Sequence, residues 1–240
     1  MAWFHRVYDA LGPKRWAQLS EAAKYASNYK RAQFLVEVLL GRTRKADLVA
    51  DIRQKHARDA VRALGLLPLA RGQAGERDVL ERYKIFQEYL HYARQLSAMT
   101  RDSALQAAAI GLANLARTAG YPDPVRLEWA MEAQAVADLA KGPVTVKVAD
   151  VAVALAIDAQ GDPEVTVVRQ GKTLSTIPPA VKKNTKVAAL TTRKTELRKQ
   201  ASRMRLSLEQ AMCRGDPFTG AELQQLFTHP VLAPRLERLV

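Results

Sequence analysis

The fold is decided by residues 144–174, VTVKVADVAVALAIDAQGDPEVTVVRQGKTL, in which the apolar residues are spaced by two. This alternation is typical of β-strands, because successive side chains of a strand point to opposite faces of a sheet. Turn signals stand at residues 160–163 and 170–171, and a slip at positions 149–150 indicates a bulge or a turn. We therefore predict a small antiparallel meander of two to four strands, ended by the prolines at 178–179.

The sequence before this stretch has the pattern of helices separated by short breaks. In residues 76–96 the apolar residues recur at steps of three and four, which places them on one helical face, so we expect this helix to be central and largely buried. Other helices are predicted over about 14–40, 43–64 and 102–119. The first of these is expected to have a break in its middle. Residues 71–75, RGQAG, are expected to form a flexible loop.

A long helix is predicted after the meander, over about residues 186–214, because its apolar residues form a three-four stripe. Thr219 and Glu222 have the spacing of a capping box, in which each residue satisfies a free backbone donor at the start of a helix. We expect a short helix to begin there and a final helix to run into Val240.

These patterns predict a mainly α fold with a small antiparallel β-meander (α+β): a helical bundle or short helical array, then the meander, then the long helix. Gly142–Pro143 follows a helix predicted from Pro124 to about residue 140 and marks the change of period. We place the domain boundary there, with a helical domain over 1–140 and the meander plus C-terminal helices over 141–240. The two domains could also pack as one unit.

The composition is that of a folded globular protein that does not cross a membrane. Of 240 residues, 48% are hydrophobic and 25% are charged, which argues against bulk disorder. The single cysteine, Cys213, excludes an internal disulfide and a four-thiolate metal site. The N-terminus has no signal-peptide pattern, and charges interrupt the most apolar stretch, 144–159. We therefore expect a cytoplasmic location.

No catalytic, cofactor or metal motif is recognised. Gly171-Lys172-Thr173 lacks the preceding glycine and the following helix of a phosphate-binding loop, so we interpret it as a turn. The paired carboxylates of Glu128 and Glu132 are expected to be solvated surface groups. None of the histidines pairs at metal-ligand spacing, and His91 is expected in the core; the four are His5, His56, His91 and His229.

Positive charge is the one functional signal. The net charge is +13, and residues 169–205 hold eleven Lys or Arg residues against one acid, Glu196. Such a field attracts nucleic acid, anionic lipid or acidic protein. On a helical projection three of these residues lie along one edge of the apolar stripe and two on the far side, which is a weaker nucleic-acid signature than one basic face. The candidate anion- or nucleic-acid-binding residues are Lys182, Lys183, Lys186, Lys194, Arg198, Lys199, Arg203 and Arg205. A solvated or intramolecularly paired helix is the alternative.

Several segments of the second half resemble a bacterial domain of unknown function that accompanies WGR domains, as in molybdate-metabolism-regulator-like proteins. The resemblance covers about residues 121–240. It rests on 121–129 (YPDPVRLEW), 171–179 (GKTLSTIPP), 197–212 (LRKQASRMRLSLEQAM), Phe218, Glu222-Leu223 and His229-Pro-Val-Leu232. Phe218 and Leu223 stand where such domains often have tryptophans. The resemblance supplies no catalytic residues, and no WGR-like sequence stands in the chain.

Three functions remain open. The first is a non-catalytic helical regulatory or scaffold module of a larger bacterial protein, whose partner is the remainder of the same polypeptide or another protein. The second is a nucleic-acid-associated module that binds through the basic helix. The third is a fragment of an enzyme whose site lies beyond Val240. No cofactor is predicted for any of them.

Overall fold

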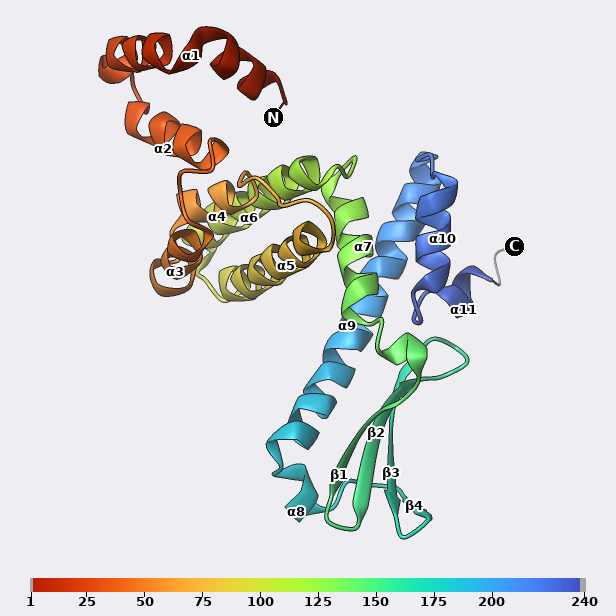
Figure 1. Ribbon diagram of the computed structural model, residues 1–240. Coiled ribbons are helices and arrows are strands. Elements are labelled where there is room, and N and C mark those ends of the chain that lie inside the picture. Colours follow the sequence, from red (N-terminus) through yellow and green to blue (C-terminus); the bar gives the residue numbers. More distant parts are fainter. Residues whose placement is uncertain (1, 238–240) are drawn as a thin grey trace. The chain divides into compact units, whose positions relative to one another are not determined.

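The computed structural model describes residues 2–237, apart from the side chains at positions 2, 225 and 235. It is mainly helical (67%), with helices first, then a four-stranded antiparallel meander, then a long helix (Figure 1). The predicted fold class is thereby confirmed. The chain divides into two compact units, Met1–Glu128 and Trp129–Val240, which are described separately.

The first unit is helical. Its predicted helix over 43–64 is in fact two helices, because His56 adopts a left-handed conformation (φ 50°) and its ring stacks on Tyr92 at 3.6 Å between centroids. The expected loop at 71–75 is partly helical, since a helix already begins at Gln73. The elements are α1 (Ala2–Ala22), kinked at Gly12, then η1 (Ala23–Tyr25), α2 (Tyr29–Leu39), α3 (Lys45–Lys55), α4 (Arg58–Leu64), α5 (Gln73–Arg94), α6 (Ala98–Ala119) and the beginning of α7 (Pro124–Ala135).

Helices α4, α5 and α6 pack closely because small residues stand where they meet (Figure 1). A side-chain carbon at Gly111 on α6 would lie 2.4 Å from the ring of Phe86 on α5 and 2.6 Å from the backbone oxygen of Val61 on α4. Phe86 and Val61 are fully buried. The predicted central position of the helix over 76–96 follows from this contact.

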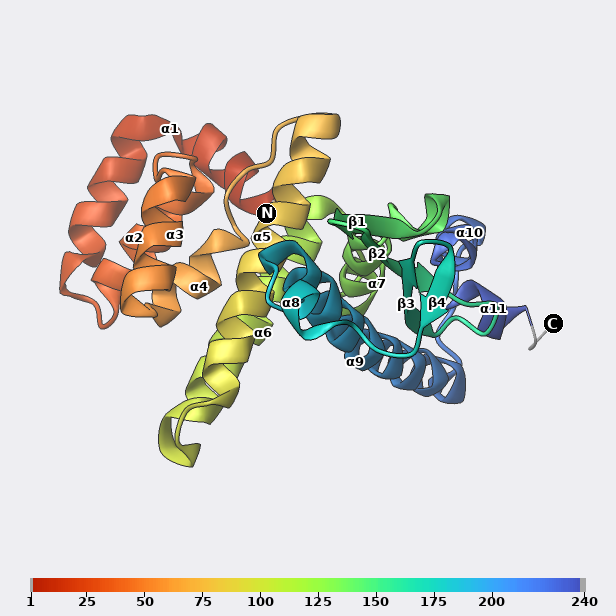
Figure 2. The ribbon, with the colours of Figure 1, turned by 90° about the horizontal axis from the view of Figure 1, so that it is seen from below.

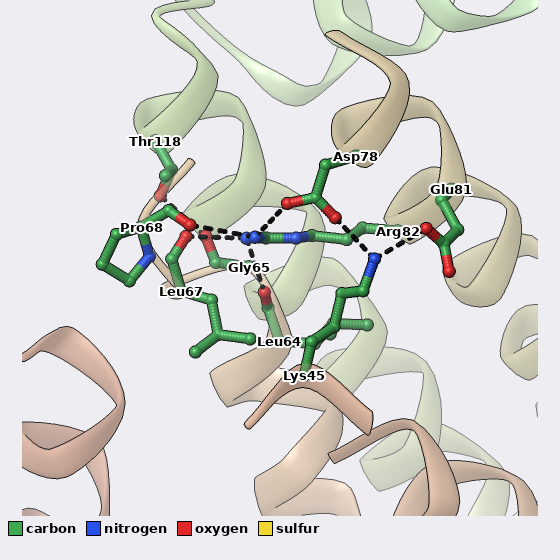
Figure 3. Close-up of polar contacts among 9 residues, drawn as sticks. All are labelled: Lys45, Leu64, Gly65, Leu67, Pro68, Asp78, Glu81, Arg82 and Thr118. Atoms are coloured by element: carbon green, nitrogen blue, oxygen red, sulfur yellow. Dashed lines mark hydrogen bonds and ion pairs between the residues drawn. The ribbon is translucent and has the colours of Figure 1, made fainter. Parts of the chain in front are cut away.

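A buried arginine joins α5 to the end of α4 (Figure 3). The guanidinium of Arg82 is 2% exposed, and it donates hydrogen bonds to the backbone oxygens of Leu64 (3.3 Å), Leu67 (2.7 Å) and Pro68 (3.1 Å). It also donates to the carboxylate of Asp78, one turn earlier on α5. Arg82 therefore satisfies carbonyls that the end of α4 and the following loop would otherwise leave without donors.

A second cation completes this network. The Nζ atom of Lys45 on α3 lies 2.9 Å from the carboxylate of Asp78 and 2.6 Å from that of Glu81. Burial raises the pKa of the Asp78 carboxyl, but hydrogen bonds from Arg82 and Lys45 outweigh it, so the pKa lies below its usual value. One charge cluster, buried at Arg82 and open to solvent at Glu81, thus connects α3, the α4–α5 loop and α5.

The second unit holds the meander and the long helix. The turns predicted at 149–150 and 170–171 lie between strands, and the one predicted at 160–163 runs into the strand that begins at Pro163. The capping box of Thr219 and Glu222 is present. The final helix ends at Leu236, and residues 238–240, into which it was predicted to run, lie outside the described residues. The elements after α7 are η2 (Leu139–Lys141), β1 (Val144–Val148), β2 (Val151–Ile157), β3 (Pro163–Arg169), β4 (Lys172–Leu174), α8 (Pro179–Lys182), α9 (Thr185–Arg214), α10 (Gly220–Thr228) and α11 (Ala233–Leu236).

The sheet has the strand order β1-β2-β3-β4, and α9 runs along it (Figures 1 and 2). Val153 on β2 pairs with Val146 on β1 and with Val167 on β3. Alternate residues of β2 and β3 point toward one core, which also receives the apolar stripe of α9. The buried members are Val136, Leu139, Val151, Val153, Leu155, Val167, Val181, Val187, Leu190 and Leu197.

Two polar contacts tie the segment before the sheet to α9. The Glu132 side chain is 7% exposed and accepts a hydrogen bond from the buried amide of Gln200, so the expectation that Glu132 is a solvated surface group was wrong. Arg193 holds the carboxylate of Asp138 with both terminal nitrogens, at 2.7 and 2.6 Å. The hydrogen bond from Arg193 is the main cause that lowers the pKa of Asp138.

The buried histidine is His229, not His91. His91 is exposed and its Nε2 atom contacts the amide of Gln95, so the expectation of a core position was wrong. His229 is 1% exposed; its Nδ1 accepts a hydrogen bond from the backbone of Val231, and its Nε2 has no partner among the described residues. Burial lowers the pKa of His229 to about 4, because the charged imidazolium is poorly solvated there.

Over residues 2–237, none of the helices is both long enough and apolar enough to cross a lipid bilayer.

Replacing Arg82 with Leu is expected to lower the free energy of unfolding by about 3–5 kcal/mol, because the carbonyls and Asp78 lose their buried donor. Arg77→Leu removes the same charge from an exposed position of the same helix and should change it by less than about 0.5 kcal/mol. Urea denaturation followed by circular dichroism measures both. Equal effects of the two variants would contradict the role assigned to Arg82.

The lowered pKa of His229 makes stability depend on pH. Its folded pKa of about 4 lies below the ordinary 6.5, so the unfolded chain takes up the proton first as the pH falls. The free energy of unfolding is therefore highest above about pH 6.5 and should fall by about 3 kcal/mol through this group as the pH reaches 4. Urea titrations at several pH values should show this loss in the wild type and in His91→Leu, but not in His229→Leu. Identical pH profiles for all three proteins would show that His229 is not the group responsible.

Candidate functional site

The eight basic residues predicted as an anion or nucleic-acid site all lie on α8, on α9 or on the link between them. Lys194 is half-buried and the others are exposed. Three of the residues stand where α8 passes into α9, namely Lys182, Lys183 and Lys186. Five more follow along α9, namely Lys194, Arg198, Lys199, Arg203 and Arg205.

Around α9 these side chains point in different directions. Lys194, Arg198 and Arg205 follow one another at steps of four and seven, so they share one side of the helix and line a common groove. Lys199 and Arg203 do not line it, and Lys199 instead forms an ion pair of 3.3 Å with the acid one turn before. The structure thus brings together three of the eight predicted residues and separates them from the other five.

The groove lies between α9 and the tip of the β2–β3 hairpin and has a volume of about 620 Å³. Besides its three basic side chains, the helix wall presents Ser202. The hairpin wall presents three acids, Asp158, Asp162 and Glu164. No ion pair joins Asp158 or Glu164 to a described basic residue of the opposite wall. Asp158 and Glu164 therefore stand opposite basic side chains of the groove without an ion pair to them.

The acidic wall is held by the geometry of its turn. The carboxylate of Asp158 accepts hydrogen bonds from the backbone N–H groups of Gln160 (2.9 Å) and Asp162 (2.8 Å). Gly161 has a φ of 82°, and a side-chain carbon there would lie only 2.4 Å from the backbone oxygen of Val231. The turn therefore requires glycine, and its tip rests directly on the chain just before α11.

The charge excess of residues 169–205 is only partly neutralised. Ion pairs join Arg169 to Asp150 at 2.7 Å and Arg193 to Asp138 at 2.6 Å, and Arg205 approaches Glu209 at a longer 3.7 Å. Other cations of this segment make no ion pair among the described residues: Lys172, Lys182, Lys183, Lys186, Lys194, Arg198 and Arg203. Some cations of the segment are thus paired within the chain, as the alternative of a solvated or intramolecularly paired helix expects, and the anion-binding surface stays a prediction.

A second candidate surface lies at the N-terminal helices, where every residue from Trp3 to Glu37 is at least partly exposed. Tyr25 is 92% exposed, Trp3 68% and Leu19 52%. Seven of the chain's 15 aromatic residues (Phe, Trp and Tyr) stand in this short stretch: Trp3, Phe4, Tyr8, Trp16, Tyr25, Tyr29 and Phe34. This aromatic density was the signal that sequence reasoning did not use.

The aromatic side chains of α1 gather across its kink. The ring of Trp16 packs edge-on against Phe4 and Tyr8, with centroids 5.6 and 5.4 Å apart. Arg42, which follows α2, donates a hydrogen bond of 2.8 Å to the hydroxyl of Tyr8 and forms an ion pair of 3.1 Å with Glu37. The contact of Arg42 with Tyr8 connects the first half of α1 to the end of α2.

Between α1 and α2 lies a hollow of about 740 Å³. Its apolar lining includes Tyr8, Trp16, Leu19, Tyr29, Ala32 and Val36, and these six residues are called the α1–α2 surface below. Side chains of Glu21, Gln33, Glu37 and Arg42 form polar parts of the same lining. A mostly apolar lining that also carries polar side chains is typical of a site that contacts another molecule.

The other sequence motifs lie outside these two surfaces. Gly171-Lys172-Thr173 stands at the β3–β4 turn, as interpreted from the sequence, with Gln170 and Gly171 at positive φ. Cys213 is exposed near the end of α9. Within the described part of the chain, no three His, Cys, Asp or Glu side chains gather as they would around a metal ion.

Two family descriptions match the sequence. Residues 171–240 match a domain of unknown function, DUF4132, which confirms the expected domain of unknown function for that part of the chain. No curated protein and no solved structure matches. Residues 1–131, more than half of the chain, match the family of unknown function DUF5724, and this range overlaps the segments of the stated resemblance only from residue 121 on. The chain therefore belongs to the DUF5724 family.

Proposed function

We propose that this chain is a non-catalytic helical scaffold module that binds another protein through the α1–α2 surface. One observation carries the proposal: seven aromatic side chains lie in a stretch, residues 3–37, that buries none of its residues. The α1–α2 surface is concave and apolar, which suits the apolar face of a partner helix.

The energetics of the segment support this role. A helix of eleven residues, such as α2, is marginal in water by itself and depends on packing. Complete burial of a large apolar side chain contributes about 1.5–3 kcal/mol, and residues 3–37 realise only part of this gain within the described structure. A partner that covers Trp16, Leu19 and Tyr29 would supply the rest.

The basic residues of the same helices favour an acidic partner segment. Arg6, Lys14, Arg15 and Lys30 are exposed and make no ion pair among the described residues. An amphipathic helix with leucines toward the hollow and glutamates at its flanks would complement both features. A second copy of this chain is a poor occupant, because it brings the same net charge of +13.

The proposal is tested with two labelled amphipathic peptides, each about five helical turns long, that share their leucines and carry either glutamate or lysine elsewhere. The glutamate peptide should bind, and Leu19→Glu with Ala32→Glu should weaken binding at least about tenfold, because both introduce charge into the hollow. Met99→Glu is the matched control, since Met99 is 93% exposed and lies outside the α1–α2 surface. Fluorescence anisotropy measures the affinities.

Three outcomes would contradict it. The first is equal binding of both peptides, and the second is equal weakening by the Met99→Glu control. The third is absence of peptide binding together with one of two other results. Binding to vesicles that contain phosphatidylserine would assign the surface to membranes. A dimer that Leu19→Glu abolishes would assign it to self-association.

A nucleic-acid-associated module is the second candidate, favoured by one observation. Lys182, Lys183 and Lys186 are exposed at the α8–α9 junction and make no ion pair among the described residues. They stand apart from the acids that face Lys194 and Arg198. A phosphate backbone would therefore meet this junction more favourably than the groove.

Gel-shift titration with duplex and single-stranded DNA and RNA tests this candidate. If about four phosphates are contacted, the logarithm of the binding constant should fall with the logarithm of salt with a slope of about −3 to −4. Replacing Lys182, Lys183 and Lys186 with Glu should then weaken binding to all sequences alike, and Lys55→Glu, an exposed control in the first unit, should not. Absence of binding at low salt would remove the candidate.

We further propose that the module acts within bacterial proteins that resemble molybdate metabolism regulators, together with a WGR domain. The DUF4132 match over residues 171–240 and the similar segments of the second half support this association. The gene offers a direct test, because a WGR domain encoded in the same reading frame would support the proposal and a reading frame without one would contradict it.

A further inference from the structure

We propose that the groove between α9 and the β2–β3 hairpin binds a small zwitterion. Its anionic group, a phosphate or carboxylate, would lie against Lys194, Arg198 and Arg205. Its amine would lie against Asp158 and Glu164 of the hairpin wall. This site is independent of the α1–α2 surface, which lies in the other unit.

The helix wall has the donors that an anionic group needs. Lys194 and Arg198 make no ion pair among the described residues, and the contact of Arg205 with Glu209 is long, at 3.7 Å. Arginine and lysine bind phosphate and carboxylate through charge-assisted hydrogen bonds. Ser202 adds a hydroxyl on the same wall. Three cations and a hydroxyl thus converge on one side of the groove.

The hairpin wall has acceptors in a fixed position. Glu164 is exposed on β3 and Asp158 is half-buried at the end of the hairpin. Gly161 rests on the backbone of Val231, and the Asp158 carboxylate closes the turn. These contacts fix the backbone of the turn and the carboxylate of Asp158. A ligand therefore meets one acid of this wall already in place.

The balance of charges distinguishes the ligand class. A polyanion such as duplex DNA would meet the acids as well as the bases, and a simple anion or a simple amine would satisfy only one wall. A molecule with both charges satisfies the two walls together. The volume of about 620 Å³ lies within the range of roughly 300–1,000 Å³ that is usual for small-molecule sites.

Isothermal titration calorimetry on the whole chain tests the proposal with four probes: O-phosphoethanolamine, 4-aminobutyrate, inorganic phosphate and ethanolamine. At least one of the two zwitterions should bind at least about tenfold more tightly than inorganic phosphate and ethanolamine. Comparison of O-phosphoethanolamine with 4-aminobutyrate shows whether the anionic group is a phosphate or a carboxylate.

Charge-reversal variants place the ligand in the groove. Arg198→Glu should weaken the better zwitterion at least about tenfold. Arg203→Glu makes the same charge change on α9 outside the groove and should weaken it less than about twofold. Glu164→Lys should change the affinities of two probes in opposite directions. The zwitterion should bind more weakly, because its amine loses an acidic partner. Inorganic phosphate should bind more tightly, because it gains a cation.

Any of three results would overturn the proposal. One is that neither zwitterion binds saturably to a chain whose circular dichroism shows it to be folded. Another is that inorganic phosphate binds as tightly as the zwitterions, which would indicate a simple anion site. The last is that Arg198→Glu and Arg203→Glu weaken binding equally, which would indicate attraction by the overall charge of α9.

Discussion

The second unit depends on one constraint: the apolar stripe of α9, a helix of thirty residues, has to be covered by other parts of the chain. The sheet and η2 cover the first part of the stripe, where Val187, Leu190 and Leu197 are buried. Farther along, Met204 and Leu208 are buried as well. Polar side chains are left at the two margins of the stripe. One margin ties the helix to the segment before the sheet, and the other margin forms the basic wall of the groove.

The same packing explains why the groove is charged. Residues beside a buried stripe lie next to whatever covers it, so the margin of α9 faces the end of the β2–β3 hairpin. Hairpin tips favour Asp and Gly for their turn geometry, which places acids opposite the bases of the helix. The groove thus follows from a helix, a turn and their close packing, with no irregular segment needed to build it.

Regular patterns made most of the fold predictable from the sequence. The meander and α9 carry long stretches of one period, bounded by turn residues at Gly161 and Gly215. Features that depend on distant partners could not be predicted. The division between α3 and α4 rests on the contact of His56 with Tyr92. Arginine is usually exposed at the surface of a protein. Arg82 is buried because the carbonyls of a loop surround its guanidinium.

The candidate sites were predictable to a smaller extent. The basic residues of α9 were evident from charge alone, but the acids opposite Arg198 come from a hairpin whose place depends on Val231. Glu132 was misjudged because its partner, Gln200, lies 68 positions later. The aromatic residues before position 35 can be read from the sequence. That none of them is buried is known only from the three-dimensional structure. Burial is a property of the assembled chain, so local pattern does not determine it.

The contact between Gly161 and Val231 has a consequence for the order of events on the ribosome. The β2–β3 hairpin is local and can form soon after its own residues emerge, because its strands are adjacent in sequence. The surface that supports its tip is made some seventy residues later. Chains begin to fold from the N-terminus during synthesis. The tip of the hairpin therefore lacks that support until almost the whole of the second unit has been translated. The groove therefore takes its final form only after Val231 has been synthesised.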